Sequence, residues 1–197
     1  ALNPEVQKKA VDTRGESLTQ GMQLLLNDLK QGHMSLTDES VFEVGRNVAT
    51  TEGSVVYENP FFQLIEYKPL TDKVHEVPFI FVPPAINKFY ILDLQPDNSL
   101  VRYLLSQGHR VFMVSWVNAD DSLAKCTWDD YIEEGVIKAI NTTREITGSD
   151  KVNALGFCVG GTLLATALAT LAGRGEKPAA SLTLLTTFLD FSDTGIM

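Results

Sequence analysis

One stretch of this sequence decides its fold, namely Leu155-Gly156-Phe157-Cys158-Val159-Gly160-Gly161-Thr162. It follows a short apolar run and opens an apolar run of helical length, so it predicts a sharp turn from a strand into a helix. The spacing G-x-C-x-G is typical of a nucleophile elbow, because small residues such as Gly156, Gly160 and Gly161 let the strand and the helix approach each other. We therefore predict that Cys158 is a nucleophile at the tip of this turn.

Two backbone amides are candidate donors to an oxyanion beside this cysteine. The N–H of Val159 directly follows the nucleophile, and a helix N-terminus there favours a thiolate and stabilises developing negative charge. The loop at residues 82–94 leaves the first strand of the series, where hydrolases with such an elbow place their second amide. Its candidates lie near Ile86 and Asn87. The alternative for this loop is a proline-stiffened surface segment with aromatic residues that belong to the core.

The cysteine itself also has other interpretations. It could be a buried structural residue beside glycines that only pack a helix on a strand, since free cysteine often behaves as a small hydrophobe. Phosphate binding is disfavoured, because no G-x-G-x-x-G is present and no Lys-Ser/Thr follows the glycines. If the cysteine is catalytic, a thiolate exchanges readily with a thioester and keeps the acyl group activated. That tendency suits transfer to a hydroxyl better than hydrolysis.

Apolar strands alternate with amphipathic helices on both sides of the turn. The strands are expected at residues 78–82, 111–116, 152–157 and 181–189, and the helices at residues 99–107, 128–147 and 162–173. This alternation predicts right-handed βαβ units and a parallel sheet covered on both faces. A strand pair at residues 54–58 and 61–67 precedes it. The predicted fold class is α/β, with an α/β-hydrolase-like, mostly parallel sheet and flanking helices.

The first 36 residues have a different character, since they are polar and helical. Leucines and Met22 share one face of residues 20–29, Gly32 is a helix stop, and residues 37–40 predict a turn or a helix start. We expect two domains: residues 1–50 as a helical N-terminal lead, and residues 51–197 as a partial α/β-hydrolase core that carries the elbow.

Composition excludes several classes of protein. The 197 residues include 16 Lys+Arg against 25 Asp+Glu, a net charge of −9, which disfavours nucleic acid and anionic membranes as partners. The longest nearly apolar stretch, residues 162–172, is too short to be a transmembrane segment. No spacing of His, Cys, Asp or Glu predicts a metal site. Two cysteines make no disulfide framework and favour a reduced, cytoplasmic compartment. Cys126 is expected to be structural.

The sequence offers no clear general base that could remove the proton from Cys158. Only His33, His75 and His109 exist, and all three precede Cys158, whereas the α/β-hydrolase order places the histidine last. Each is expected to be a surface residue. Asp190 follows the predicted last strand, where some hydrolases keep their acid, but a loop or cap role is at least as plausible. We expect the catalytic His and Asp to lie outside this chain, which would stop before the last strands and the lid.

Five segments together resemble class I polyhydroxyalkanoate synthases over nearly the whole chain. They are residues 156–162, with the lipase-like box, and residues 83–88, 93–96, 127–131 and 184–191. The resemblance implies an acyltransferase that polymerises (R)-3-hydroxyacyl-CoA, typically 3-hydroxybutyryl-CoA, and releases CoA, with Cys158 carrying the growing polyester chain. It implies no cofactor, because the coenzyme A thioester is the substrate. It also implies a homodimer when complete, a cytoplasmic location at polyhydroxyalkanoate granules, and inactivity of this segment alone.

Two other functions remain open at this point. One is a cysteine hydrolase of the dienelactone hydrolase type, which has a similar elbow and would release free acid without CoA. The other is a non-catalytic, granule-associated module that keeps the fold without the activity.

Overall fold

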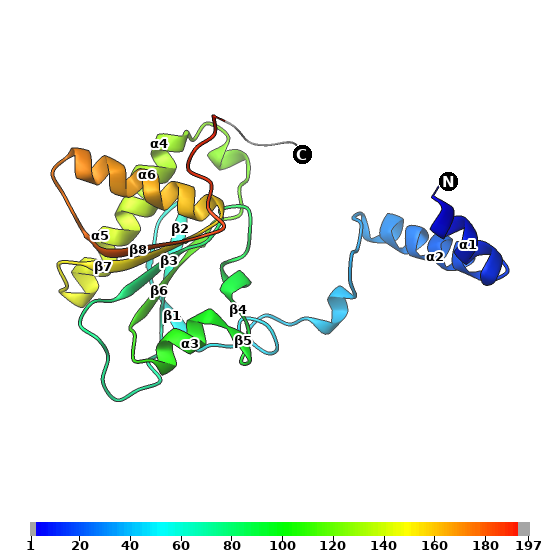
Figure 1. Ribbon diagram of the computed structural model, residues 1–197, viewed down its shortest axis with the longest axis horizontal. Coiled ribbons are helices and arrows are strands. Elements are labelled where there is room, and N and C mark those ends of the chain that lie inside the picture. Colours follow the sequence, from blue (N-terminus) through cyan, green and yellow to red (C-terminus); the bar gives the residue numbers. More distant parts are fainter. Residues whose placement is uncertain (1–2, 193–197) are drawn as a thin grey trace. The chain divides into compact units, whose positions relative to one another are not determined.

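The computed structural model describes residues 3–192 (Figure 1), and the chain divides between Glu43 and Val44 into two compact units. The first unit contains helices α1 (Pro4–Asp12) and α2 (Glu16–Gln31) and a short 3-10 helix, Glu39–Val41. The side chain of Asn3 caps α1 by accepting the Glu5 N–H at 2.9 Å. Gly32 ends α2 in a left-handed conformation, as predicted.

One feature of this unit differs from the predicted helical stretch. The helical stretch is interrupted between α1 and α2, where Arg14 and Gly15 both have positive φ, at 50° and 89°. No residue of either helix is buried. The leucines of α2 are therefore exposed, and the amphipathic pattern that predicted the helix has no core beneath it among the described residues.

The second unit is built on a six-stranded sheet with the strand order β1-β2-β6-β3-β7-β8. The strands are β1 (Gly53–Glu58), β2 (Phe62–Tyr67), β3 (Phe79–Val82), β6 (Val111–Trp116), β7 (Val152–Phe157) and β8 (Ala179–Leu185). β6, β3, β7 and β8 are parallel, while β1, β2 and β6 pair antiparallel. A small hairpin, β4 (Asp93–Gln95) and β5 (Asn98–Ser99), lies apart from it. The sheet is thus mostly parallel, which confirms the predicted class.

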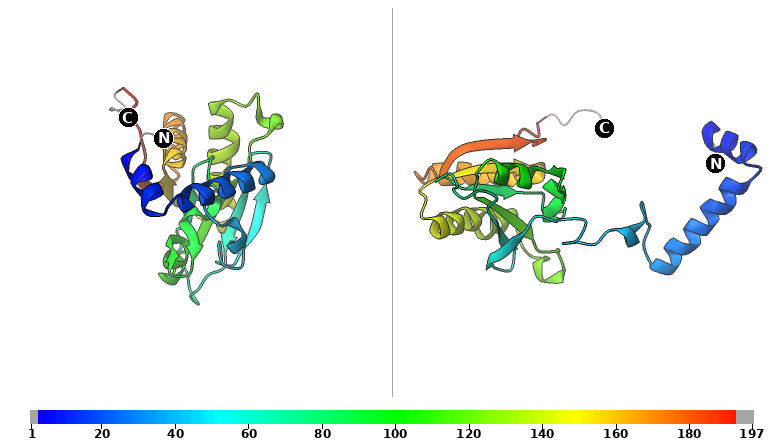
Figure 2. Two further views of the ribbon diagram at one scale, coloured as in Figure 1. Left: turned by 90° about the vertical axis from the view of Figure 1, so that its right-hand side faces the viewer. Right: turned by 90° about the horizontal axis from the view of Figure 1, so that it is seen from below.

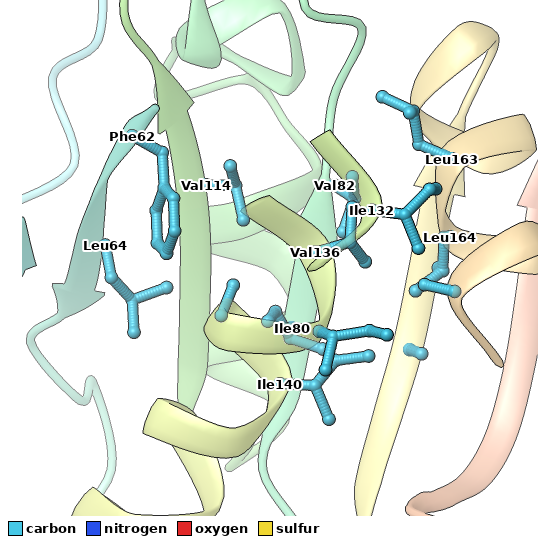
Figure 3. Packing of buried hydrophobic residues seen from close by; sticks show 14 of the residues in the cluster. Phe62, Leu64, Ile80, Val82, Val114, Ile132, Val136, Ile140, Leu163 and Leu164 are labelled. Atoms are coloured by element: carbon cyan, nitrogen blue, oxygen red, sulfur yellow. The ribbon is translucent and has the colours of Figure 1, made fainter. Parts of the chain in front are cut away.

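Helices cover both faces of this sheet. Ile80 and Val82 of β3 face a core shared with α5 (Lys138–Thr147) and α6 (Val159–Gly173), shown in Figure 3. Phe81, between them in sequence, faces a second core under α3 (Leu100–Ser106) on the other face. Alternation along a strand separates the two sets because successive side chains point to opposite faces. Figure 2 shows β8, in orange-red, at the edge of the sheet.

Three predicted elements differ from the structure, one in its division into helix types and two by more than a residue at an end. The helix expected at residues 128–147 consists of α4 (Trp128–Asp130), a π-helix (Tyr131–Ile137) and α5. Helix α6 begins three residues earlier than predicted, directly after Cys158, because the glycines of the turn are helical. The strand expected at residues 181–189 ends at Leu185, since Thr186 has a φ of 45° and turns the chain out of the sheet.

The strand order reverses at β3, whose neighbours are β6 on one side and β7 on the other. The connections that leave β3 and β6 pass over opposite faces, through α3 and through α4 and α5. Such a reversal opens a crevice at the carboxyl ends of the strands, which is where open α/β sheets bind ligands. The segments at that place are the loop after β3 and the turn after β7.

Candidate active site

Cys158 lies alone between a strand and a helix, since β7 ends at Phe157 and α6 begins at Val159. Its backbone has φ 53° and ψ −126°, a conformation that costs a non-glycine residue about 1–3 kcal/mol. The side chain is half-buried and the cysteine is free. A strained residue at the tip of a strand–turn–helix is the arrangement that presents a nucleophile above a sheet.

The glycines around the cysteine bring the strand and helix into direct contact. A Cβ added at Gly156 would overlap the Cα of Gly161, and one added at Gly160 would overlap the Val82 carbonyl oxygen. A Cβ on Gly161 would overlap the Thr187 hydroxyl. At Gly156 and Gly160 no side chain larger than hydrogen fits without a backbone shift, and at Gly161 the Thr187 side chain would have to move.

Hydrogen bonds from the backbone and from one hydroxyl hold the turn in place. The Cys158 N–H donates to the Leu185 carbonyl at 2.9 Å, and the Cys158 carbonyl accepts the Gly161 N–H at 2.9 Å. The Thr162 hydroxyl donates to the Phe188 carbonyl at 2.8 Å. The bonds to Leu185 and Phe188 join the turn to the end of β8 and to the segment after it, so the strained conformation is enforced by its surroundings.

The amide of Val159 is the first of α6, so it has no acceptor within the helix. In the loop after β3, the Asn87 N–H already donates to the Pro84 carbonyl at 3.1 Å. The N–H of Ile86, the other candidate amide in that loop, has no acceptor within the described residues. β3 lies directly beside β7, with Val82 opposite Gly156, so the loop and the turn leave neighbouring strand ends.

The three histidines lie away from this turn or in the other unit. His109 precedes β6 and His75 precedes β3, so both are at the amino ends of strands whose carboxyl ends face the elbow. Their rings are 4.7 Å apart, and the His75 ring bonds the Gln107 carbonyl. Burial, and then the nearby His75, lower the pKa of His109. His33 belongs to the first unit, where it contacts Glu39 at 3.2 Å.

Asp190 and Cys126 lie in separate local environments. Asp190 is exposed, five residues past the end of β8, and accepts the Ser192 N–H at 2.9 Å. Hydrogen bonds from Ser192 lower the pKa of Asp190, as in a turn-capping aspartate. Cys126 is half-buried against the core and precedes α4.

Within residues 3–192, no cluster of His, Cys, Asp or Glu could hold a metal ion. The same residues contain no helix that is long and apolar enough to cross a membrane.

Sequence reasoning missed one neighbour of this site. The indole Nε1–H of Trp116, at the end of β6, donates to the Pro83 carbonyl at 2.8 Å. A tryptophan at the carboxyl end of a central parallel strand is the only signal in the sequence, and by itself it indicates no more than core packing.

The sheet and the turn together define the α/β-hydrolase fold, and the family described as "alpha/beta hydrolase fold" matches residues 78–196. The family described as "Poly-beta-hydroxybutyrate polymerase (PhaC) N-terminus" matches residues 1–104. The chain belongs to this polymerase family.

Curated relatives agree with this assignment over almost all of the chain. The poly(3-hydroxyalkanoate) polymerase subunit PhaC of Cupriavidus necator is 63% identical over 197 residues, which is 100% of this chain and 33% of that protein. The Rhizobium meliloti PhaC subunit is 41% identical, covering 98% of this chain and 32% of its own length. This chain therefore spans about a third of the curated relatives that it matches.

Solved structures share the fold at low identity. A fungal esterase from Rhizomucor miehei has a TM-score of 0.52 at 16% identity, covering 81% of this chain and 51% of its own. EstE7, an HSL homologue from a metagenome library, also has a TM-score of 0.52 at 16% identity, with 76% and 48% covered.

Proposed function

We propose that the protein carrying this chain is an acyltransferase that polymerises (R)-3-hydroxyacyl-CoA into polyhydroxyalkanoate, with Cys158 as its nucleophile. The observation that carries this proposal is the strained conformation of Cys158 between β7 and α6, in a chain of the polymerase family. A buried structural cysteine would have no need of such a conformation, whereas a nucleophile does.

The reaction proceeds through a thioester on the enzyme. The Cys158 thiolate attacks the carbonyl carbon of the acyl-CoA, the carbon–sulfur bond to CoA breaks, and the CoA thiolate takes up a proton. The hydroxyl end of a polyester chain then attacks the acyl-enzyme, so an ester bond forms and the carbon–sulfur bond to Cys158 breaks. The hydroxyl proton passes to the base, and the cysteine leaves as a thiolate. The amides of Val159 and Ile86 donate to the oxyanion in both steps.

The base that removes the proton from Cys158 is proposed to lie outside these 197 residues. His75 and His109 are at the opposite ends of the strands, and Asp190 caps a local turn. A histidine and an aspartate from the remaining two thirds of the polymerase would supply these roles. No cofactor is proposed, since the CoA thioester is itself the activated substrate.

The proposed partners are the substrate, the growing polyester, a second copy of the complete protein and the surface of polyhydroxyalkanoate granules in the cytoplasm. Each follows from the family and not from a contact in the structure.

The decisive experiment uses a chimera in which this chain replaces the matching third of the Cupriavidus necator polymerase. CoA thiol release from (R)-3-hydroxybutyryl-CoA is measured together with insoluble polymer. Cys158→Ala should reduce release by about a thousandfold or more. Alanine has no greater difficulty than cysteine at a positive φ, so this variant should fold.

Cys126→Ser is the matched control, because it changes the other free cysteine away from the elbow and should keep most of the activity. Polymer formation that survives Cys158→Ala would refute the proposed nucleophile. CoA release that yields only free hydroxy acid would identify a hydrolase, and no release from a folded chimera would favour a non-catalytic module.

A further inference from the structure

Trp116 links three elements around the elbow. It is the last residue of β6, is 8% exposed, and its Nε1–H donates to the Pro83 carbonyl at 2.8 Å. Indole N–H groups need a partner when buried, so this bond fixes where the ring and the carbonyl lie relative to each other.

Pro83 is the first residue of the loop that carries the Ile86 amide. Neither Pro83 nor Pro84 has an N–H, so the sheet hydrogen bonding of β3 ends at this point and the loop has few backbone anchors. The Pro83 carbonyl is also packed against the first turn of α6, because a Cβ on Gly160 would come within 2.5 Å of its carbon and oxygen. One carbonyl group is thus held between the indole and the elbow helix.

The indole is itself immobilised on its other side. A Cβ on Gly135, within the π-helix, would lie 2.8 Å from the ring atom Cζ3 of Trp116. The rings of Phe62 and Tyr131 are centred 6.3 and 5.7 Å from the Trp116 ring. The indole is packed against these two rings and against Gly135, whose missing side chain leaves the space that the indole fills. These contacts hold the indole in one orientation.

A second hydrogen bond also links the loop after β3 to the segment at the end of β6, but it is exposed. The Lys88 ammonium donates to the Asn118 side chain at 2.7 Å, joining the loop after β3 to the loop after β6. Lys88 has a long flexible side chain in solvent, so this bond orients the loop less strongly than the buried indole does.

We propose that Trp116 is a positioning residue for acyl transfer: its indole N–H sets the Pro83 carbonyl, and through it the Ile86 amide, at the distance from Cys158 that an oxyanion requires. This inference rests on the proposed function. It adds a residue from β6, which neither carries the nucleophile nor donates to the oxyanion. A small displacement of an oxyanion donor lowers the rate of acyl transfer strongly, because the donor's hydrogen bond forms fully only in the transition state.

The test compares two reactions of the same cysteine in the chimera described above. Acylation by (R)-3-hydroxybutyryl-CoA passes through an oxyanion, whereas alkylation by iodoacetamide displaces iodide and creates no oxyanion. Trp116→Phe keeps an aromatic ring against Gly135 and removes the donor. We expect kcat for CoA release to fall about ten- to a hundredfold with KM little changed. The rate of Cys158 alkylation, followed by peptide mass spectrometry, should stay within about twofold.

Two further variants separate positioning from packing. Phe112 is on the same strand and in the same core as Trp116, opposite Ile80. Phe112→Leu therefore removes core packing and leaves the hydrogen bond to Pro83 unchanged. It should lower the unfolding temperature and leave kcat unchanged. Replacement of Trp116 by benzothienylalanine, which keeps the ring shape with sulfur in place of N–H, should reproduce the loss in kcat with no loss of stability from a smaller ring.

Three results would overturn the inference. Unchanged kcat in the benzothienylalanine variant would show that the hydrogen bond does not position the loop. Equal losses of acylation and alkylation would show that Trp116 supports the elbow as a whole. A loss of kcat in Phe112→Leu equal to that in Trp116→Phe would assign the effect to packing. Failure of the proposed function itself is distinct. It appears with Trp116 intact, as activity that survives Cys158→Ala, as release of free hydroxy acid without polymer, or as no CoA release at all.

Discussion

Cys158 has an unfavourable backbone conformation because its neighbours leave it no other. Its N–H is bound by Leu185 and its carbonyl by Gly161, while the glycine contacts bring α6 directly onto β7 and β3. Relaxing the cysteine would break these bonds and separate the helix from the sheet. Strain at one residue is thus maintained by the packing of several, which is common at functional sites.

Gly160→Ala tests this packing at the level of one methyl group. The added Cβ would overlap the Val82 and Pro83 backbone, which cannot move as a flexible side chain could. We expect the free energy of unfolding to fall by about 3 kcal/mol or more, because overpacking against backbone has no easy relaxation. Urea unfolding followed by circular dichroism measures this loss.

Gly173→Ala is the matched control in the same helix. A Cβ there has nothing within 4 Å, and Gly173 is the last residue of α6. Alanine should be neutral or stabilise by up to about 1 kcal/mol, since it restricts the unfolded chain. Similar losses from Gly160→Ala and Gly173→Ala would contradict the close approach at the elbow.

At the scale of elements, the start of the long helical segment was predictable from its capping residues. Thr127 accepts the Asp130 N–H, and the Asp130 carboxylate accepts the Thr127 N–H at 2.7 Å. The bonds that the Thr127 N–H and hydroxyl donate to the Asp130 carboxylate hold the pKa of Asp130 below its usual range. The π-helix that follows was not predictable, because a single i→i+5 turn has no period of its own in the sequence. It places Gly135 against the indole of Trp116.

Thr127→Ala removes the side-chain half of this capping box. We expect the free energy of unfolding to fall by about 1 kcal/mol, because a helix N–H loses its acceptor. Thr127→Ser keeps a hydroxyl and should restore most of the loss, as measured by urea unfolding. A serine variant as unstable as the alanine variant would show that the capping bond contributes little.

His109 predicts a dependence of stability on pH at the amino ends of β3 and β6. Burial and the neighbouring His75 lower its pKa in the folded protein, and its Nδ1 is buried with no hydrogen-bond partner among residues 3–192. Below about pH 6.5 the unfolded chain therefore binds a proton that the folded chain resists, so the free energy of unfolding decreases as the pH falls.

His109→Gln should reduce this loss, because glutamine does not titrate. The measurement is the urea midpoint at about pH 7.5 and about pH 5.5 for both proteins. If the variant loses as much stability on acidification as the parent does, another group is responsible.

At the scale of the whole molecule, the two units should differ greatly in local stability. Helices α1 and α2 bury no residue, and helices of 9 and 16 residues are marginal in water without packing. By contrast, every residue of β6 except the half-buried Ser115 is buried between two layers of helices. We expect amides of α1 and α2 to exchange with deuterium orders of magnitude faster than those of β3, β6 and β7. Comparable protection in both units, measured by mass spectrometry, would show that the apolar face of α2 is covered in solution.

The sequence by itself determined the fold class of this protein and the place of the strand–turn–helix that carries Cys158. Strand–helix alternation follows from the hydrophobic period, and the sharp turn follows from glycines spaced between an apolar strand and an apolar helix, so both are local properties of the chain. Tertiary structure alone decided the strand order, the end of β8 at Leu185, the π-helix and the bond from Trp116 to Pro83. The physical reason is that these depend on which distant segments meet, and 33 residues separate the Trp116 donor from its acceptor in the sequence.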